Sequence, residues 1–298
     1  MPAVVSHYLL GERVFDNLAE NKPTLRLNHT AFLWGAYGPD IFFTHRVMPW
    51  QRGKSISQLS KKMHNTNAEK ILNYLMAYSK ANESVIAESY ALGFATHYAF
   101  DSTAHPFVNY FASVMEEENP SIHHSIYHNE IESSLDTIFL KYEKNIQIHE
   151  FKLQQTSPVD KDVIMVIADV LHKYFLSYGF GNIPKQDIVQ AQYDWHNSLV
   201  LLTDRSTLKK SAVKLGEKLL HMSPMLSPII RTPHPNLSCD YANLKHTEWY
   251  ASYDKDTVHK ESFFELADIS EELSLKLISE MISGNTLTHN DCILSFSG

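Results

Sequence analysis

Two stretches of this 298-residue sequence place histidine and carboxylate side chains at intervals of four residues. The residues are His97, Asp101 and His105 in the first stretch, and His124, His128 and Glu132 in the second. On an α-helix, side chains four residues apart lie on the same face. Imidazole and carboxylate groups suit zinc, and two ligands on one rigid helix fix two bonds to a metal without ordering a loop. The spacing therefore predicts two helices that each present metal ligands.

Helices with hydrated polar faces would show the same spacing. The sequence around His97 argues against that alternative, because Leu92, Phe94 and Phe100 surround it with apolar side chains. A buried imidazole there needs a polar partner or a metal ion. Five of the 17 histidines also fall between residues 97 and 128. Histidines scattered over a protein surface would not readily give this density. We therefore favour metal binding.

The rest of the chain also favours helices. It contains only 10 glycines and 12 prolines, whereas sheet-rich proteins need many turn residues between short strands. Helices are predicted from apolar spacing and end signals over residues 67–81, 84–105, 121–143, 160–178, 185–203, 206–221 and 261–283. The hydrophobic content of 44% supplies a core. We predict an all-α protein, a single multi-helix bundle of residues 1–298 with a clustered zinc site in its interior.

Several helix ends carry recognisable signals. Ser84 and Ser121 suit N-cap positions, and Gly284 stands where a helix commonly ends. Pro106 lacks the amide hydrogen that a continuing helix requires, so the second helix is expected to end at that proline. Residues 222–243 contain four prolines and are expected to form a loop.

Charge and composition limit the classes of partner that the protein is expected to bind. The formal net charge of -8 disfavours a stable nucleic-acid partner or an anionic membrane held by bulk charge. The sequence shows no basic leader with an apolar core and no run of about 18 apolar residues, so we expect a cytoplasmic protein without a transmembrane segment. Cys239 and Cys292 are too few for a disulfide scaffold and are expected to be free thiols. A phosphate substrate held by metal is compatible with this charge.

Three residues earlier in the chain are further candidates. Asp40 follows a Gly-Pro turn and precedes an apolar run, which would place its carboxylate at the mouth of a core, where it could orient a water. An ordinary turn-forming aspartate is an equal alternative. His7 and His64 are each a metal ligand or a surface histidine, and the local sequence favours the surface.

Six short segments, in this order, resemble the zinc-dependent phospholipase C family. They are SHYLLG (6–11), GAYGPDIF (35–42), MHNTN (63–67), HYAFDSTAHPFVNY (97–110), HNEIESSLD (128–136) and NLKHTEWY (243–250). The HxxxDxxxHP element and the later HxxxE are the most specific parts. The resemblance covers most of the chain and implies an α-helical bundle that holds three clustered zinc ions over a phosphodiester.

The resemblance also implies a role for each candidate residue. The zinc ligands would be His64, His97 and Asp101 for one ion, and His105, His128 and Glu132 for a second. Asp101 would also bridge to a third zinc, completed by His7 and, in secreted members, by the main chain of an aromatic N-terminal residue. This chain begins Met1-Pro2, so the third ion requires that Met1 be removed and that Pro2 substitute. Asp40 matches the acidic residue that positions the attacking water.

The implied function is a zinc-dependent phosphodiester hydrolase, in which metal-activated water attacks a phospholipid-type or other small phosphodiester. One alternative is a nuclease, because single-strand nucleases share the three-zinc arrangement. Another is a non-catalytic scaffold whose zinc is structural, with closed four-ligand coordination instead of an open position. His124 is expected to face solvent, with support of a neighbouring metal ligand as the alternative. Tyr98, Phe107 and Tyr110 are expected to pack in the core, with a headgroup pocket as the alternative.

Overall fold

The computed structural model describes residues 3–48, 50–205, 208–221, 224, 226–236 and 239–296. Within these ranges the chain forms ten α-helices, three short 3-10 helices and one two-stranded sheet. In chain order the elements are α1 (Val4–Asn21), α2 (His29–Ala36), η1 (Gly38–Phe42), α3 (Gln58–His64), α4 (Ala68–Ala81), α5 (Val85–Glu118), α6 (His124–Lys144), η2 (Leu153–Thr156), α7 (Lys161–Ser177), α8 (Lys185–Ser198), η3 (Leu199–Leu202), α9 (Lys209–Leu219), β1 (Trp249–Ala251), β2 (Asp254–His259) and α10 (Phe263–Ser283). The all-α prediction is confirmed.

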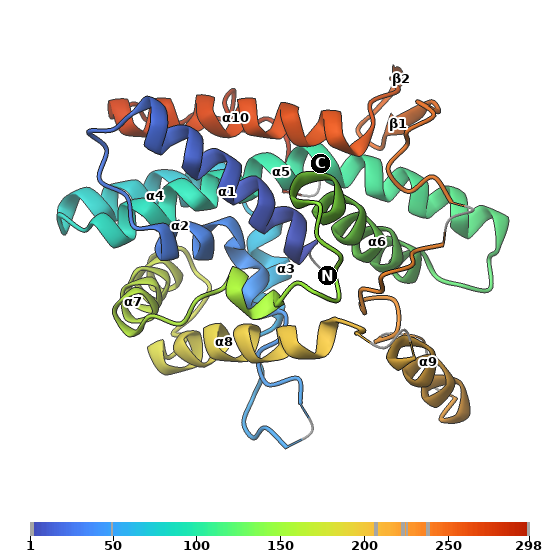
Figure 1. Ribbon diagram of the computed structural model, residues 1–298. Helices are drawn as coiled ribbons and strands as arrows, with labels where there is room; N and C mark the ends of the chain where they lie inside the picture. Colours follow the sequence, from blue (N-terminus) through green and yellow to red (C-terminus); the bar gives the residue numbers. More distant parts are fainter. Residues whose placement is uncertain are drawn as a thin grey trace.

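Helix α5 runs through the centre of the bundle (Figure 1). It has 34 residues, a length of about 50 Å. Most of its side chains between Ala87 and Val108 are buried, and a helix that is apolar on every side must be covered on every side. Helices α1, α2, α4, α6, α7 and α10 and strand β1 all contact it. Polar side chains in the middle of α5 therefore lie inside the protein.

A close contact between α2 and α5 places the turn that follows α2. A Cβ atom at Gly93 of α5 would collide with the main-chain carbonyl oxygen of Phe32 in α2. Glycine lets the two backbones approach directly, without side chains between them. Because α2 leads into η1, this contact sets the turn that carries Asp40 against the middle of α5.

The expected end of the second helix at Pro106 is wrong, since α5 continues to Glu118. Pro106 removes the main-chain hydrogen bond to the Ser102 carbonyl, and an interior proline costs about 3 kcal/mol. Phe107 and Val108, directly after the proline, are buried. Burial of the continuing helix offsets the lost hydrogen bond, an effect that the local sequence does not reveal.

The start of α6 also differs from the expectation. Ser121 is not the N-cap; the helix begins at His124, and His123 caps it by accepting a hydrogen bond from the Ser125 amide at 3.2 Å. An imidazole nitrogen here takes the acceptor role of the expected hydroxyl. At the other end of the chain, Gly284 terminates α10 with a φ of 84°, as predicted.

The sequence did not indicate the β1–β2 hairpin. Its antiparallel strands place Trp249 opposite His259 and Ala251 opposite Asp254. Trp249 is buried and its ring lies 5.6 Å from that of Phe107, so the hairpin covers the second half of α5 (Figure 1). Strand β1 has only three residues, and β2 is polar and exposed along most of its length, so neither gives an apolar alternation.

The proline-rich segment is a loop in its described residues, as predicted. The predicted helix over 206–221 appears as α9, with residues 206 and 207 outside the described ranges. Within the described residues, neither Cys239 nor Cys292 takes part in a disulfide. Among the described residues, no helix combines the length and apolar character needed to cross a membrane.

Candidate metal centre

Eight side chains from five elements gather beside the middle of α5. They are His7 of α1, Asp40 of η1, His64 of α3, His97, Asp101 and His105 of α5, and His128 and Glu132 of α6. Their ligand atoms form three groups whose members lie within 4.8 Å of one another: His7, His97 and Asp101; Asp40, His64 and His97; and His105, His128 and Glu132. The structure thus brings together the eight residues to which the resemblance assigns a role.

Asp101 links the groups. Its Oδ2 lies 3.2 Å from Nε2 of both His64 and His97. Its Oδ1 lies 3.1 Å from Nε2 of His7 and 3.7 Å from Nε2 of His105. One carboxylate surrounded by four imidazoles can bridge neighbouring cations.

Glu132 similarly connects the two imidazoles of the group that includes α6. Its Oε1 lies 3.5 Å from His105 Nε2 and 3.2 Å from His128 Nε2. Donor atoms at about 2.1 Å from a tetrahedral zinc ion lie roughly 3.4 Å apart. The separations around Asp101 and Glu132 match that spacing.

The outer nitrogens of four imidazoles are held by oxygen atoms. The Nδ1 contacts are His64 with the Ser60 carbonyl at 2.8 Å, His97 with the Ala36 carbonyl at 3.3 Å, His105 with the Phe296 carbonyl at 2.8 Å, and His128 with Asn109 Oδ1 at 3.0 Å. A carbonyl oxygen only accepts, so each neutral ring carries its proton on Nδ1 and turns the lone pair of Nε2 toward the centre. This is the orientation that metal binding requires.

Nε2 of His97 and Oδ2 of Asp101 are buried and lack a hydrogen bond of ordinary geometry within the described part of the chain. Buried polar atoms are almost always satisfied. A bound cation would satisfy both, and imidazole with carboxylate is a typical zinc ligand set, so the residues present fit zinc.

The electrostatics of the centre favour a cation. Burial would raise the pKa of Asp101, but the neighbouring His105 and His97 hold it well below its usual range. Burial likewise opposes ionisation of Glu132, yet the charge of His128 and hydrogen bonds from the two histidines hold its pKa well below normal. Burial lowers the pKa of His105, but Asp101 and Glu132 outweigh it and raise this pKa to about 10. Both carboxylates are therefore ionised and available to bind metal.

Asp40 differs from the other two carboxylates. Burial raises its pKa, so it takes up a proton more readily than Asp101. Its Oδ1 lies 3.4 Å from His64 Nε2. Gly38 begins the same turn with a φ of +49°, and a Cβ there would collide with the His97 ring. Glycine thus allows the turn and the imidazole to lie in contact.

Solvent reaches the centre at one end. The side chains of His97 and Asp40 are 0% and 3% exposed. Those of His105 and His128 are 18% and 19% exposed. The accessible end is therefore formed by His105 and His128.

Several residues that support the ligands were not among the candidates predicted from sequence. Asn109 holds His128, as described above, and its carbonyl contacts His124 Nε2 at 3.1 Å. The expectation that His124 faces solvent is therefore wrong; it is half-buried against α5. Phe296, distant in sequence, is buried with its ring 5.6 Å from that of His64. Asn109 lies four residues after His105, so an extension of the spacing could have identified it; nothing local pointed to Phe296.

A buried ion pair fixes the start of α1, which carries His7. Asp136 Oδ1 accepts hydrogen bonds of 2.8 Å from the amide and the hydroxyl of Ser6. Its Oδ2 accepts one of 2.6 Å from Arg231, and both charged side chains are at most 2% exposed. The proline-rich loop is thus tied to the metal centre through Asp136, which follows Glu132 by four residues on α6.

Tyr98 and Phe107 are buried, as expected, whereas Tyr110 is only half-buried. Met1 and Pro2, on which completion of a third zinc site depends, lie outside the described residues.

Comparison with known proteins supports the same assignment. A family model described as zinc-dependent phospholipase C matches residues 6–182, more than half of the chain. No curated protein and no solved structure matches it. All eight residues of the metal centre lie within the matched span. The chain therefore belongs to the zinc-dependent phospholipase C family.

Proposed function

We propose that this protein is a zinc-dependent hydrolase of phospholipid-type or other small phosphodiesters. Family membership supports a hydrolase of this general kind. The observation that carries the proposal is the orientation of the four imidazoles, whose Nδ1 atoms are fixed by oxygen acceptors while their Nε2 atoms converge on Asp101 and Glu132.

Each part of the centre has a proposed role. His64, His97 and Asp101 would hold one zinc ion, His105, His128 and Glu132 a second, and His7 with Asp101 would contribute to a third. When bound, zinc lowers the pKa of water toward ~7 and neutralises phosphate charge.

Asp40 is proposed to orient the attacking water and accept its proton. Burial raises its pKa, the direction that favours proton acceptance. Its position beside His64 also lets it act as a ligand in the first group. The partly exposed His105 and His128 would leave the other end of the centre open to substrate.

The first experiment measures zinc and activity on the same preparation. Elemental analysis of protein purified without added metal should give at least two zinc ions per chain. Replacement of His128 with alanine should lower that number, whereas His149→Ala, at an exposed position away from the centre, should not. A zinc content near zero that supplementation does not raise would refute the proposal.

Three substrates then separate the alternatives. They are short-chain phosphatidylcholine below its micelle concentration, intact phospholipid vesicles, and single-stranded oligonucleotides. We expect the monomeric lipid to be hydrolysed fastest, because the net charge of -8 offers no bulk attraction to anionic surfaces or nucleic acid. Faster cleavage of oligonucleotides would favour a nuclease, and zinc binding without any hydrolysis would favour a scaffold.

A further inference from the structure

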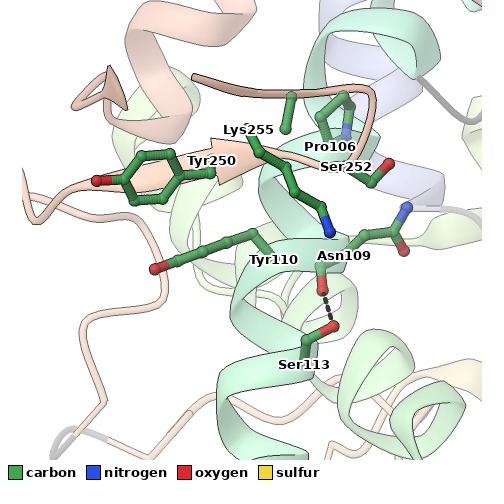
Figure 2. Close-up of a pocket in the computed structure, with 8 residues that line it drawn as sticks. Pro106, Asn109, Tyr110, Ser113, Tyr250, Ser252 and Lys255 are labelled. Carbon is green, nitrogen blue, oxygen red and sulfur yellow. Dashed lines mark hydrogen bonds between the residues drawn. The ribbon is translucent and has the colours of Figure 1, made fainter. Parts of the chain in front are cut away.

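A pocket of about 470 Å³ lies between the second half of α5 and the β1–β2 hairpin (Figure 2). It is lined by Pro106, Asn109, Tyr110 and Ser113 from α5, and by Tyr250, Ala251, Ser252 and Lys255 from the hairpin. The volume is in the range of small-molecule sites. The hairpin wall lies outside the residues matched by the family.

The pocket adjoins the open end of the metal centre. Asn109 and Ser113 continue the four-residue spacing of Asp101 and His105 along α5. Asn109 also contacts both regions, because it lines the pocket and its Oδ1 holds His128 Nδ1 at 3.0 Å. Four helical residues span about 6 Å, which is comparable to one substituent on a phosphodiester. A group attached to a phosphate at this end of the centre can therefore reach the pocket.

Lys255 sets the charge of the pocket. Among the described residues that line the pocket it is the only charged side chain, and it forms no ion pair or hydrogen bond with any described residue. Figure 2 shows it reaching from the hairpin toward Asn109 and Ser113 on α5. An unpaired ammonium at this position attracts an anionic group and repels a quaternary ammonium.

The remaining walls offer hydrogen bonds and aromatic surface. Asn109, Ser113 and Ser252 supply amide and hydroxyl groups. The rings of Tyr110 and Tyr250, with centroids 6.1 Å apart, lie together on one side of Lys255 (Figure 2). Aromatic faces pack against the C–H face of a ring while their polar tips remain hydrated. This combination suits a ring that carries several hydroxyls.

We propose that the pocket binds the headgroup of the substrate, and that this headgroup is a phosphorylated polyol, with Lys255 binding its phosphate. The inference rests on the proposed function, which places the scissile phosphodiester at the metal centre. The proposal assigns headgroup specificity to the β1–β2 hairpin wall of the pocket, which lies outside the residues that the family model matches.

Binding tests the pocket without turnover. Calorimetry with the zinc-loaded protein would measure Kd for inositol bisphosphate and for phosphocholine. Lys255→Ala should weaken inositol bisphosphate binding about tenfold, the scale of one charge-assisted hydrogen bond, and should not weaken phosphocholine binding. The control Lys161→Ala, an exposed lysine at the start of α7, should change neither. An unchanged Kd for inositol bisphosphate in Lys255→Ala would overturn the assignment.

Measurements of turnover distinguish the headgroup pocket from the proposed hydrolase function. Wild-type protein should prefer monomeric short-chain phosphatidylinositol phosphate to phosphatidylcholine, and Lys255→Ala should reduce that preference about tenfold. Hydrolysis with a preference that does not depend on Lys255 would refute the pocket but leave the proposed function intact. Absence of all hydrolysis, with inositol bisphosphate binding that still depends on Lys255, would refute the proposed function but support a polyol phosphate site.

Discussion

Two ligand groups of the metal centre are built in different ways. Asp40, His64 and His97 come from three separate elements, and each side chain is at most 11% exposed. His105, His128 and Glu132 come from α5 and α6 alone, and both of these imidazoles are nearly one-fifth exposed. The ligands of the buried group are therefore brought together by three elements, whereas those of the exposed group come from one helix pair.

The supports of the imidazoles differ in the same way. In the buried group, His64 and His97 contact main-chain carbonyls of Ser60 and Ala36. In the exposed group, His105 likewise contacts the main-chain carbonyl of Phe296, but His128 contacts the Asn109 side chain. A side-chain support can be changed by one substitution, but a main-chain support cannot. We therefore expect the exposed group to be easier to alter without loss of the fold.

Asp101→Asn should have the largest effect because Asp101 connects the two groups. An amide cannot supply the negative charge that bridges neighbouring cations, so activity should fall about 1,000-fold, as when a charge-stabilising group is lost. Elemental analysis should show fewer zinc ions per chain, and competition with a chelator should show that the class held by the exposed group is retained. Asp162→Asn, on the surface of α7, is the control. An unaltered zinc content would show that the groups do not depend on Asp101.

Asp40→Asn tests the role of the turn within the buried group. If Asp40 acts on water, the variant should keep most of its zinc and lose activity about 100-fold, the scale of a positioned acid-base group. Turnover and zinc content measured together distinguish the roles. Loss of zinc in parallel with activity would make Asp40 a ligand, and full activity would remove it from the mechanism.

Asn109→Leu should act on the exposed group alone. Without the acceptor for His128 Nδ1, zinc affinity of that group should fall about 10- to 100-fold. Competition with a chelator would show one weakened class of zinc while the buried class stays unchanged. Ser113→Ala, one turn further along α5, should leave both classes as in the wild type. Equal weakening of both classes would contradict the independence of the exposed group.

The exposed group was the part of the centre most open to prediction. Side chains four residues apart must share a helical face, so the pairs in α5 and α6 were evident from spacing alone. His7 and His64 were different: their local sequence favoured the surface, and only the family resemblance identified them. The structure places both inside, because α1 and α3 bring them to Asp101.

The sequence by itself determined the helical character of the chain, the ligand pairs on α5 and α6, and the end of α10 at Gly284. All of these depend on interactions between residues a few positions apart. Tertiary structure decided the passage of α5 through Pro106, the contact of η1 with His97 and the insertion of Phe296 beside His64. These features gain their free energy from burial against residues distant in sequence, and local spacing carries no information about which distant residues those are.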